Sequence, residues 1–334
     1  MTHALNPDGR RAHGPADAWV QCGCGQRHWG TAGAAGLLLA DGGPTDVAPT
    51  RVVLQFRAAW SHHGGTWGVP GGALDPDEDS LTGALREAEE EAGIPPAAVA
   101  PLATSVLRHP DWSYTTVLGR TVRHVDPAPT DAESAEVAWV DVDEVVNRPL
   151  LPAFAEAWPS LATLLRVRPV LVVDAANVVG SRPDGWWRDR AGAASRLAGE
   201  LAALAARGVP AGLLGLPADH WWPEVVMVVE GAARGITIGP DDHAVSGAGQ
   251  PGPVLPRVRI VDAAGSGDDE IVRQVVAARA PATPARAPTA PTSAVAGPAV
   301  TVATSDRGLR ERVSAAGGRW VGVSALRAHL DSAH

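Results

Sequence analysis

Residues 72–94 read GALDPDEDSLTGALREAEEEAGI, and this stretch decides the fold of the first half of the chain. Glu87, Glu90 and Glu91 are spaced i, i+3 and i+4, which brings their carboxylates to one face of a helix. Three like charges on one face repel one another unless a cation joins them. Hard divalent cations such as Mg²⁺ bind carboxylates and take further ligands from phosphates. The segment therefore predicts a cation-binding helix that suits a diphosphate.

The residues around this helix support the same interpretation. Residues 67–72, WGVPGG, precede it, and the glycines at 71 and 72 let the backbone approach an ion closely. Asp79 or Ser80 is expected to cap the start of the helix, and Gly93 to end it. The alternative is an ordinary exposed acidic helix without a ligand.

The segment resembles the Nudix box, on Gly72, Glu78 and the run REAEEEAGI at 86–94. Nudix proteins are Mg²⁺-dependent hydrolases that cleave a diphosphate linked to a nucleoside and another group. The resemblance implies an α/β/α sandwich for this half. Ala88 departs from the pattern, since a larger aliphatic residue is usual there, and this thins the packing of the helix.

The resemblance also implies roles for individual residues. Arg86 orients Glu87, and Glu87 is either the general base or a bridge between metals. Glu90 and Glu91 bind the metal, which is Mg²⁺ or Mn²⁺, and the carbonyl of Gly71 is a further ligand. Arg86, Glu87 and Glu90 are thus the predicted catalytic residues.

Further candidates in this half lie outside the box. Nudix proteins often use another glutamate, and Glu133 and Glu136 are candidates for it; the alternative is a solvated turn carboxylate. His62 and His63 precede Trp67 in a loop and either contact the substrate or are exposed and inert.

Cys22, Cys24 and His28 offer three soft ligands in the spacing C-x-C-x₃-H. Zinc usually takes four ligands, and this spacing is cramped. The sequence therefore favours a reduced turn over a metal site.

Length and composition indicate the number of domains and the cellular location to expect. A chain of 334 residues with 45% hydrophobic residues predicts two domains. Two cysteines form no disulfide framework, and no apolar run approaches the roughly 20 residues that span a bilayer. The N-terminus lacks a signal-peptide core. We therefore expect a cytoplasmic protein without a membrane partner, and the sequence leaves its oligomeric state open.

Charge is unusual in kind and in distribution. All 28 basic residues are Arg, which excludes Schiff-base chemistry on lysine and a P-loop lysine. Residues 1–165 carry 21 acidic and 10 basic residues, whereas 166–334 carry 16 and 18. The second half is therefore the better candidate for nucleic-acid binding.

Hydrophobic patterning predicts one α/β domain over residues 1–166. Strands are expected at 33–40, 51–57, 101–108, 113–124 and 136–140, after a loose N-terminus. A closing helix is expected over 149–165.

A second domain is predicted over 167–334. Residues 169–175, PVLVVDA, form an apolar run that ends in a carboxylate, as in a parallel strand buried on both faces. Alternating elements then predict a doubly wound parallel sheet, with strands at 224–229, 257–262, 299–304 and 319–322 and helices at 187–207, 268–279, 306–316 and 324–331. The Ala/Pro/Thr-rich stretch 281–298 predicts a disordered insertion.

Acidic residues follow several of these strands. Asp174 ends the first strand, Asp268 and Asp269 begin a helix, and Asp306 follows a later strand. Because the carboxyl ends of parallel strands share one crevice, these acids are expected to converge into a second metal site. The alternative is that they only cap helices.

Three stretches of the second half, VVDAANVVG at 172–180, GSGDDEIV at 265–272 and TVATSDRGL at 301–309, resemble the PIN-like NYN ribonuclease fold. Asn177 matches the asparagine that gives this family its name and is a candidate substrate-binding residue. The resemblance implies metal-dependent cleavage of phosphodiesters and RNA as a partner.

The leading interpretation is a Nudix hydrolase that acts on a nucleoside diphosphate derivative or a nucleoside triphosphate. The alternative is a metal-dependent ribonuclease whose Nudix half processes nucleotides or RNA ends. A third is a nucleotide sensor without catalysis, and the intact pair of Arg86 and Glu87 argues against it.

Overall fold

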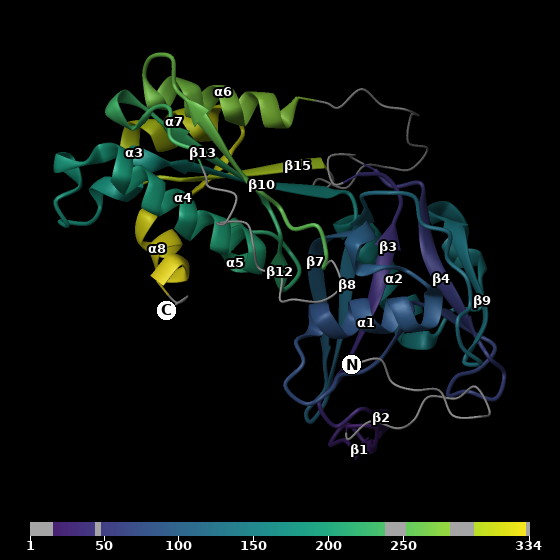
Figure 1. The fold of residues 1–334 in the computed structure, drawn as a ribbon. Helices are drawn as coiled ribbons and strands as arrows, with labels where there is room; N and C mark the ends of the chain where they lie inside the picture. The colour runs from purple at the N-terminus through teal and green to yellow at the C-terminus, as the bar shows by residue number, and fades with distance from the viewer. Residues whose placement is uncertain (1–15, 44–47, 238–251, 281–296, 332–334) are drawn as a thin grey trace. The chain divides into compact units, whose positions relative to one another are not determined.

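The computed structural model describes residues 16–43, 48–237, 252–280 and 297–331 (Figure 1). The chain divides into two compact units. Unit 1 comprises Met1–Arg166 and Gln250–Val254, and unit 2 comprises Val167–Gly249 and Leu255–His334. The predicted insertion at 281–298 falls outside the described residues except for its last two, which belong to a strand. No helix in the described ranges has the length and hydrophobicity needed to cross a membrane.

Unit 1 is built on a mixed sheet in the order β7-β8-β3-β4-β5, in which β6 also pairs with β3 and β9 with β4. The strands β3 and β8 run parallel, and the other pairs are antiparallel. Their bounds are β3 Ala34–Ala40, β4 Arg51–Arg57, β5 Trp67–Gly68, β6 Gly71–Ala73, β7 Val99–Arg108, β8 Ser113–Thr121 and β9 Ser134–Asp141. The predicted strands of this half are present, and the short β5 and β6 were not predicted.

Helix α1, Ser80–Ala92, follows β6 directly and packs against β3. Asp79 caps its start by accepting hydrogen bonds from Leu81 N and Thr82 N, and Gly93 ends it in the left-handed region at φ 63°. Ala88 is fully buried in the core under this helix, so the small residue sits where α1 meets the sheet. Helix α2, Pro152–Leu164, closes the unit and buries Phe154 and Trp158.

A hairpin precedes this sheet. Its strands are β1, Trp19–Gln21, and β2, Arg27–Trp29, which pair antiparallel. The sequence predicts a loose segment here because three-residue strands with mostly exposed side chains leave no alternating pattern.

Unit 2 contains a five-stranded parallel sheet in the order β14-β13-β10-β15-β16. In order along the chain this is 3-2-1-4-5, the doubly wound order, with its switch point beside β10. The predicted parallel sheet is therefore confirmed. The bounds are β10 Val167–Asp174, β13 Glu224–Val229, β14 Val258–Asp262, β15 Gly297–Ala303 and β16 Arg319–Val321.

Helices cover both faces of this sheet, with α6 and α7 on one side and α4 and α8 on the other (Figure 1). Ile271, Val275, Leu309 and Val313 of α6 and α7 pack on strand valines in one core. The bounds are α3 Ala175–Gly180, α4 Arg190–Arg207, α5 Ala211–Leu214, α6 Gly267–Arg279, α7 Arg307–Ala315 and α8 Val323–Asp331. A short antiparallel pair, β11 Val209–Pro210 with β12 His220–Trp221, lies outside the parallel sheet.

Candidate functional site

Arg86 is the centre of a carboxylate network in the middle of α1. Its guanidinium donates to both oxygens of Glu78 at 2.9 and 2.8 Å, to Glu87 Oε1 at 2.7 Å and to Glu90 Oε2 at 3.2 Å. It also donates to the carbonyl of Ala73 at 3.1 Å, which ties the helix to β6. Burial lowers the pKa of Arg86, but the carboxylates of Glu78 and Glu87 raise it by more, so the pKa lies above its ordinary value. Arg86 is therefore a fixed positive charge that orients three carboxylates.

Glu87 and Glu91 are buried, at 2% and 3% exposure, on the face of α1 that meets the glycine turn. Glu91 Oε2 accepts a hydrogen bond from Gly71 N at 2.8 Å. Gly72 lies against Glu87 so closely that a Cβ on this residue would be 2.7 Å from Oε2. The structure therefore brings the predicted glycines and box glutamates together, with a side-chain-free approach to the carboxylates.

Tyr114 of β8 lies beside the same carboxylates, and sequence reasoning missed it. Burial raises its pKa, and the negative charges of Glu91 and Glu87 raise it further, so the phenol stays neutral. Its hydroxyl fills the space in front of Gly36 and Gly71, where added Cβ atoms would contact it. No local signal in the sequence could have found it, because β8 lies far from the box along the chain and reaches it through pairing with β3 and contact with α1.

Of the glutamates proposed outside the box, Glu136 lies in the first half of β9 and Glu133 directly precedes this strand. Glu136 is exposed and lies opposite Phe56 of β4, and Glu133 accepts a backbone hydrogen bond from Ala58 N at 2.8 Å. The contact of this strand with α1 is made by Ser134, whose hydroxyl donates to the carbonyl of Glu91 at 3.4 Å. The ligand role of the two glutamates stays a prediction.

His62 and His63 stack edge to face at 4.1 Å between ring centroids, in the loop between β4 and β5. His62 also meets Trp19 of the N-terminal hairpin at 5.1 Å. Burial lowers the pKa of His62, with help from the nearby His63 and Arg57, which favours the neutral imidazole. His62 thus packs against the hairpin, and contact of either histidine with a substrate stays a prediction.

In unit 2, acids from separate elements influence one another. Burial raises the pKa of Asp174, and the charges of Asp268 and Glu230 raise it further. Burial also raises the pKa of Asp268, as does Asp306. Glu230, directly after β13, accepts a hydrogen bond from Gly267 N at 2.7 Å. Glu230 was not among the predicted site residues, although its place directly after β13 resembles that of Asp174, the last residue of β10.

Two of these acids also cap helices. Asp174 accepts from Asn177 N at 3.0 Å and from Thr304 Oγ1 at 2.8 Å, and Asp306 accepts from Leu309 N at 2.7 Å. Both residues therefore cap helices, which is the alternative to metal binding given by the sequence.

The remaining candidates of unit 2 have protein partners. Asp269 pairs with Arg312 at 2.5 Å, and this guanidinium also reaches Asp268 at 3.7 Å. Asn177 Oδ1 accepts from Ser305 N at 2.9 Å and so links α3 to the end of β15. Asn177 therefore joins the two strand ends, and its substrate role stays a prediction.

Comparisons with known proteins assign unit 1 to a family. The NUDIX domain profile matches residues 31–164. The chain is 42% identical over 170 residues to a Mycobacterium tuberculosis protein named putative 8-oxo-dGTP diphosphatase 3, covering 49% of this chain and 77% of that protein. It is 46% identical over 161 residues to a Bifidobacterium longum nucleoside triphosphate pyrophosphatase/Nudix hydrolase fusion protein. This match covers 48% of our chain and only 33% of the Bifidobacterium protein.

Among solved structures, a Nudix hydrolase from M. smegmatis, RenU, is 41% identical and has a TM-score of 0.39. The match covers 43% of this chain and 92% of the M. smegmatis chain. The profile match falls on the half that carries the Arg86 network. The chain therefore belongs to the Nudix family of hydrolases, whose members act on phosphoric anhydrides.

Proposed function

We propose that unit 1 hydrolyses the diphosphate linkage of a nucleoside triphosphate or a nucleoside diphosphate derivative with Mg²⁺ or Mn²⁺. The observation that carries this proposal is the network in which Arg86 orients Glu87 and Glu90 beside the turn of Gly71 and Gly72. The name of the mycobacterial relative, an 8-oxo-dGTP diphosphatase, favours a nucleoside triphosphate as the first substrate to test.

The residues present fit a hard divalent cation. Arg86 is bonded to three carboxylates, those of Glu78, Glu87 and Glu90, so a single guanidinium cannot neutralise them. Glu91 adds a fourth carboxylate next to this network through Gly71. An excess of carboxylate oxygens beside a bare glycine turn is the donor set that Mg²⁺ prefers. When bound, the cation supplies positive charge to the phosphate oxygens and makes water more acidic.

Side chains of unit 1 provide proton transfer, positioning and hydrogen bonding in the proposed reaction. Glu87 is buried and held by Arg86 Nη1, so it can take a proton from an attacking water at a fixed position. Arg86 acts through Glu87 and is a positioning residue. The absence of a side chain at Gly72 lets the Glu87 carboxylate lie directly against the backbone of the turn. Tyr114, a neutral phenol, can donate a hydrogen bond without adding charge.

Hydrolysis by the purified full chain tests this proposal. We would assay nucleoside triphosphates, dinucleoside polyphosphates and nucleotide sugars with Mg²⁺, with Mn²⁺ and with a chelator, and identify the products. Attack on the diphosphate releases a nucleoside monophosphate, and ¹⁸O-labelled water shows which phosphorus is attacked. Absence of metal-dependent turnover on every class would refute the proposal.

A second proposal concerns unit 2, for which we infer a PIN-like NYN domain that cleaves RNA with a divalent metal. Acids at the carboxyl ends of the parallel sheet support it, because the charge of Asp268 raises the pKa of Asp174 and the charge of Asp306 raises the pKa of Asp268. Glu230 adds a fourth carboxylate to this group. RNA cleavage with Mn²⁺ should disappear in Asp268→Asn and persist in Glu87→Gln. Cleavage that is equal in both variants would assign the activity elsewhere.

We also propose that residues 1–166 and 167–334 are independent domains. The break between the two compact units falls between Arg166 and Val167, apart from residues 250–254, which group with unit 1. A fragment of residues 1–166 should unfold cooperatively and retain diphosphate hydrolysis. An insoluble fragment would show that the short segment near Val254, whose N–H donates to Val99 O at 2.8 Å, is needed by the first domain.

A further inference from the structure

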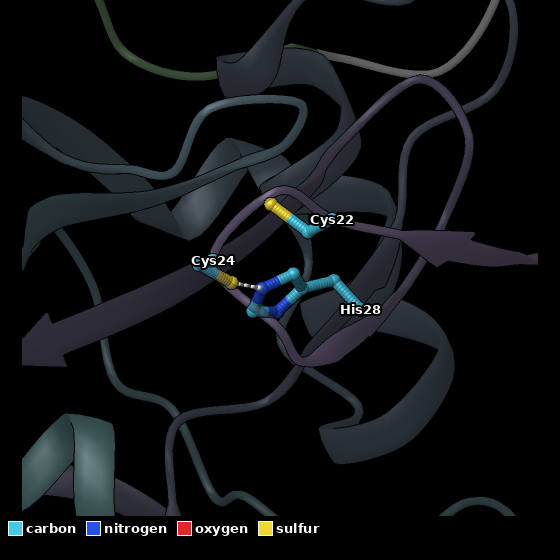
Figure 2. Close-up of side chains that lie close together, drawn as sticks. All are labelled: Cys22, Cys24 and His28. Carbon is cyan, nitrogen blue, oxygen red and sulfur yellow. Dashed lines mark hydrogen bonds between the residues drawn. The ribbon is translucent and has the colours of Figure 1, made fainter.

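The turn between β1 and β2 gathers three soft metal ligands. One ligand atom each from Cys22, Cys24 and His28 lies within 4.8 Å of the other two (Figure 2). Cys24 Sγ is 3.3 Å from His28 Nε2. A tetrahedral zinc with ordinary Zn–S and Zn–N bonds separates such atoms by about 3.6 Å. The side chains therefore stand close to zinc-binding positions in the structure.

The backbone of the turn explains how so short a spacing can work. Cys22 N donates to Gln26 O at 3.0 Å, and Gly25 N donates to Cys22 O at 2.9 Å, which folds the chain back between the strands. Gly25 has φ 86°, a left-handed conformation that favours glycine. The hairpin then places His28 opposite Val20. Because of this turn and this pairing, the imidazole ring of His28 lies next to the cysteine side chains.

A second segment, the turn between β7 and β8, holds the imidazole in place. Trp112 stacks on the His28 ring at 4.4 Å and 9°, and its Nε1 donates to Trp29 O at 3.0 Å. The His109 ring lies 4.3 Å from that of His28. These contacts fix the imidazole beside the Cys24 sulfur, so little side-chain entropy remains to be lost on binding a metal.

The turn between β7 and β8 also places a carboxylate next to the cysteines. Asp111 Oδ2 accepts a hydrogen bond from Gly23 N, the residue between the two cysteines, at 2.7 Å. The carboxylate therefore lies beside the turn, outside the group of three ligand atoms that lie within 4.8 Å of one another. Zinc accepts a carboxylate oxygen as a ligand, so a shift of Asp111 toward the cysteines would complete a set of four. The sequence could not indicate this group, because 88 positions separate Gly23 from Asp111.

We propose that Cys22, Cys24 and His28 bind Zn²⁺, with the Asp111 carboxylate as the fourth ligand. Two thiolates and an imidazole are softer than the all-oxygen donors of the Arg86 network, so the site selects Zn²⁺ over Mg²⁺. Cys24 is exposed, which gives the ion a way in, while Cys22 is buried. The ion fastens the N-terminal hairpin to the turn between β7 and β8. The site is independent of the proposed hydrolysis.

Metal content of the full chain tests this proposal. After reduction, chelation and reloading, we expect about one Zn²⁺ per chain and, with Co²⁺ in its place, a thiolate charge-transfer absorption with the visible bands of a tetrahedral site. Zn²⁺ should also raise the melting temperature, and an excess of Mg²⁺ should not compete. A chain that takes up no Zn²⁺ under these conditions overturns the proposal, as does one that instead forms a disulfide.

Matched variants identify the ligands. Cys24→Ser and His28→Gln alter side chains that are exposed and half-buried, so both should fold, and each should lose the Co²⁺ spectrum. His109→Gln, which changes a neighbouring ring outside the ligand group, should keep it. Asp111→Asn should weaken Zn²⁺ binding by about tenfold or more. Retention of the spectrum in Cys24→Ser and His28→Gln overturns the site, and unchanged affinity in Asp111→Asn overturns the role of Asp111.

Discussion

The acidic clusters of the two units are assembled in opposite ways. In unit 1 the carboxylates of Glu87, Glu90 and Glu91 come from one helix, whereas in unit 2 Asp174 and Asp268 come from separate elements. The cluster of unit 1 has a guanidinium at its centre and no helix cap among these three residues. In unit 2, Asp174 is itself a cap. Charge gathered by local spacing thus meets on one helix, where Arg86 and Gly71 N bind it, while charge gathered by topology includes a residue that also caps a helix.

The largest expected difference between the two clusters is a loss of turnover when the glutamates of α1 are changed. Glu87→Gln and Glu91→Gln should each lower the turnover of diphosphate hydrolysis by roughly 10²–10⁴-fold, the size of acid–base and electrostatic contributions. Glu89→Gln, on the same helix but two residues from Glu87, is the matched control and should be near wild type. Steady-state kinetics measure all three, and wild-type turnover in both test variants would contradict the proposed function.

The next effect concerns the guanidinium at the centre of the network. Arg86→Lys keeps the charge but cannot bond to Glu78, Glu87 and Glu90 together, because an ammonium lacks the planar fork. We expect kcat to fall by roughly 10–100-fold, as for residues that orient ligands, with a small change in KM. Arg120→Lys alters another buried arginine of unit 1 and serves as control. If both variants lose the same activity, general destabilisation and not positioning is the cause.

A smaller effect is expected from the glycine turn. Gly72→Ala places a Cβ 2.7–2.8 Å from the Glu87 carboxylate, which must move. Because the group that moves is a side-chain end, we expect little loss of stability but roughly a tenfold loss of kcat through misplacement. Gly199→Ala, where a Cβ meets nothing within 4 Å, is the control. An unchanged kcat would show that Glu87 does not act from this position.

The smallest expected effect is a change in the melting temperature of the Asp174→Asn variant, measured with a chelator present so that no metal contributes. Because burial raises the pKa of Asp174, the folded protein holds this proton to higher pH than the unfolded chain does. Stability from this group is therefore present below the ordinary Asp pKa and is lost as pH rises through the folded pKa. Asp174→Asn removes the charge, so it should raise the melting temperature by a few degrees at most near pH 7.

The gain of the Asp174→Asn variant should shrink as the pH falls toward the ordinary Asp pKa, because the raised pKa lets folded wild-type Asp174 take up its proton before the unfolded chain does. Asp306→Asn is a useful comparison because Asp306 caps α7, and asparagine caps a helix about as well. A melting temperature for Asp174→Asn that falls at neutral pH would show that its hydrogen bonds with Asn177 and Thr304 outweigh the cost of burying the charge.

The sequence predicted those parts of the molecule whose cause is local. The carboxylate face of α1, its Asp79 cap and the Gly93 stop depend on residues within one helix. The parallel sheet of unit 2 was predictable because its central strands β10 and β13 are mostly apolar runs, and the strand ends of this sheet differ from prediction by at most two residues. Helix α4 begins at Arg190 and not at Trp187, because Asp189 caps it.

What the sequence could not predict depends on contacts between distant positions. Tyr114 reaches the box carboxylates through the pairing of β8 with β3, and no spacing rule links these segments. Glu78 had a place in the box pattern, but its two hydrogen bonds with Arg86 appear only when α1 is set on β6. The hairpin of β1 and β2 was missed because its strands are too short to show a period.

The burial and pairing of strand β3 bear on how rigid the candidate site is. All seven of its residues are buried, and it pairs along its whole length with β8 and at its ends with β6 and β4. Amide hydrogens in such a strand exchange with solvent only through global unfolding. Since α1 rests on β3, the slowest-exchanging amides of unit 1 should lie directly beneath the box. Breathing motions of the molecule should therefore leave the geometry around Glu87 intact.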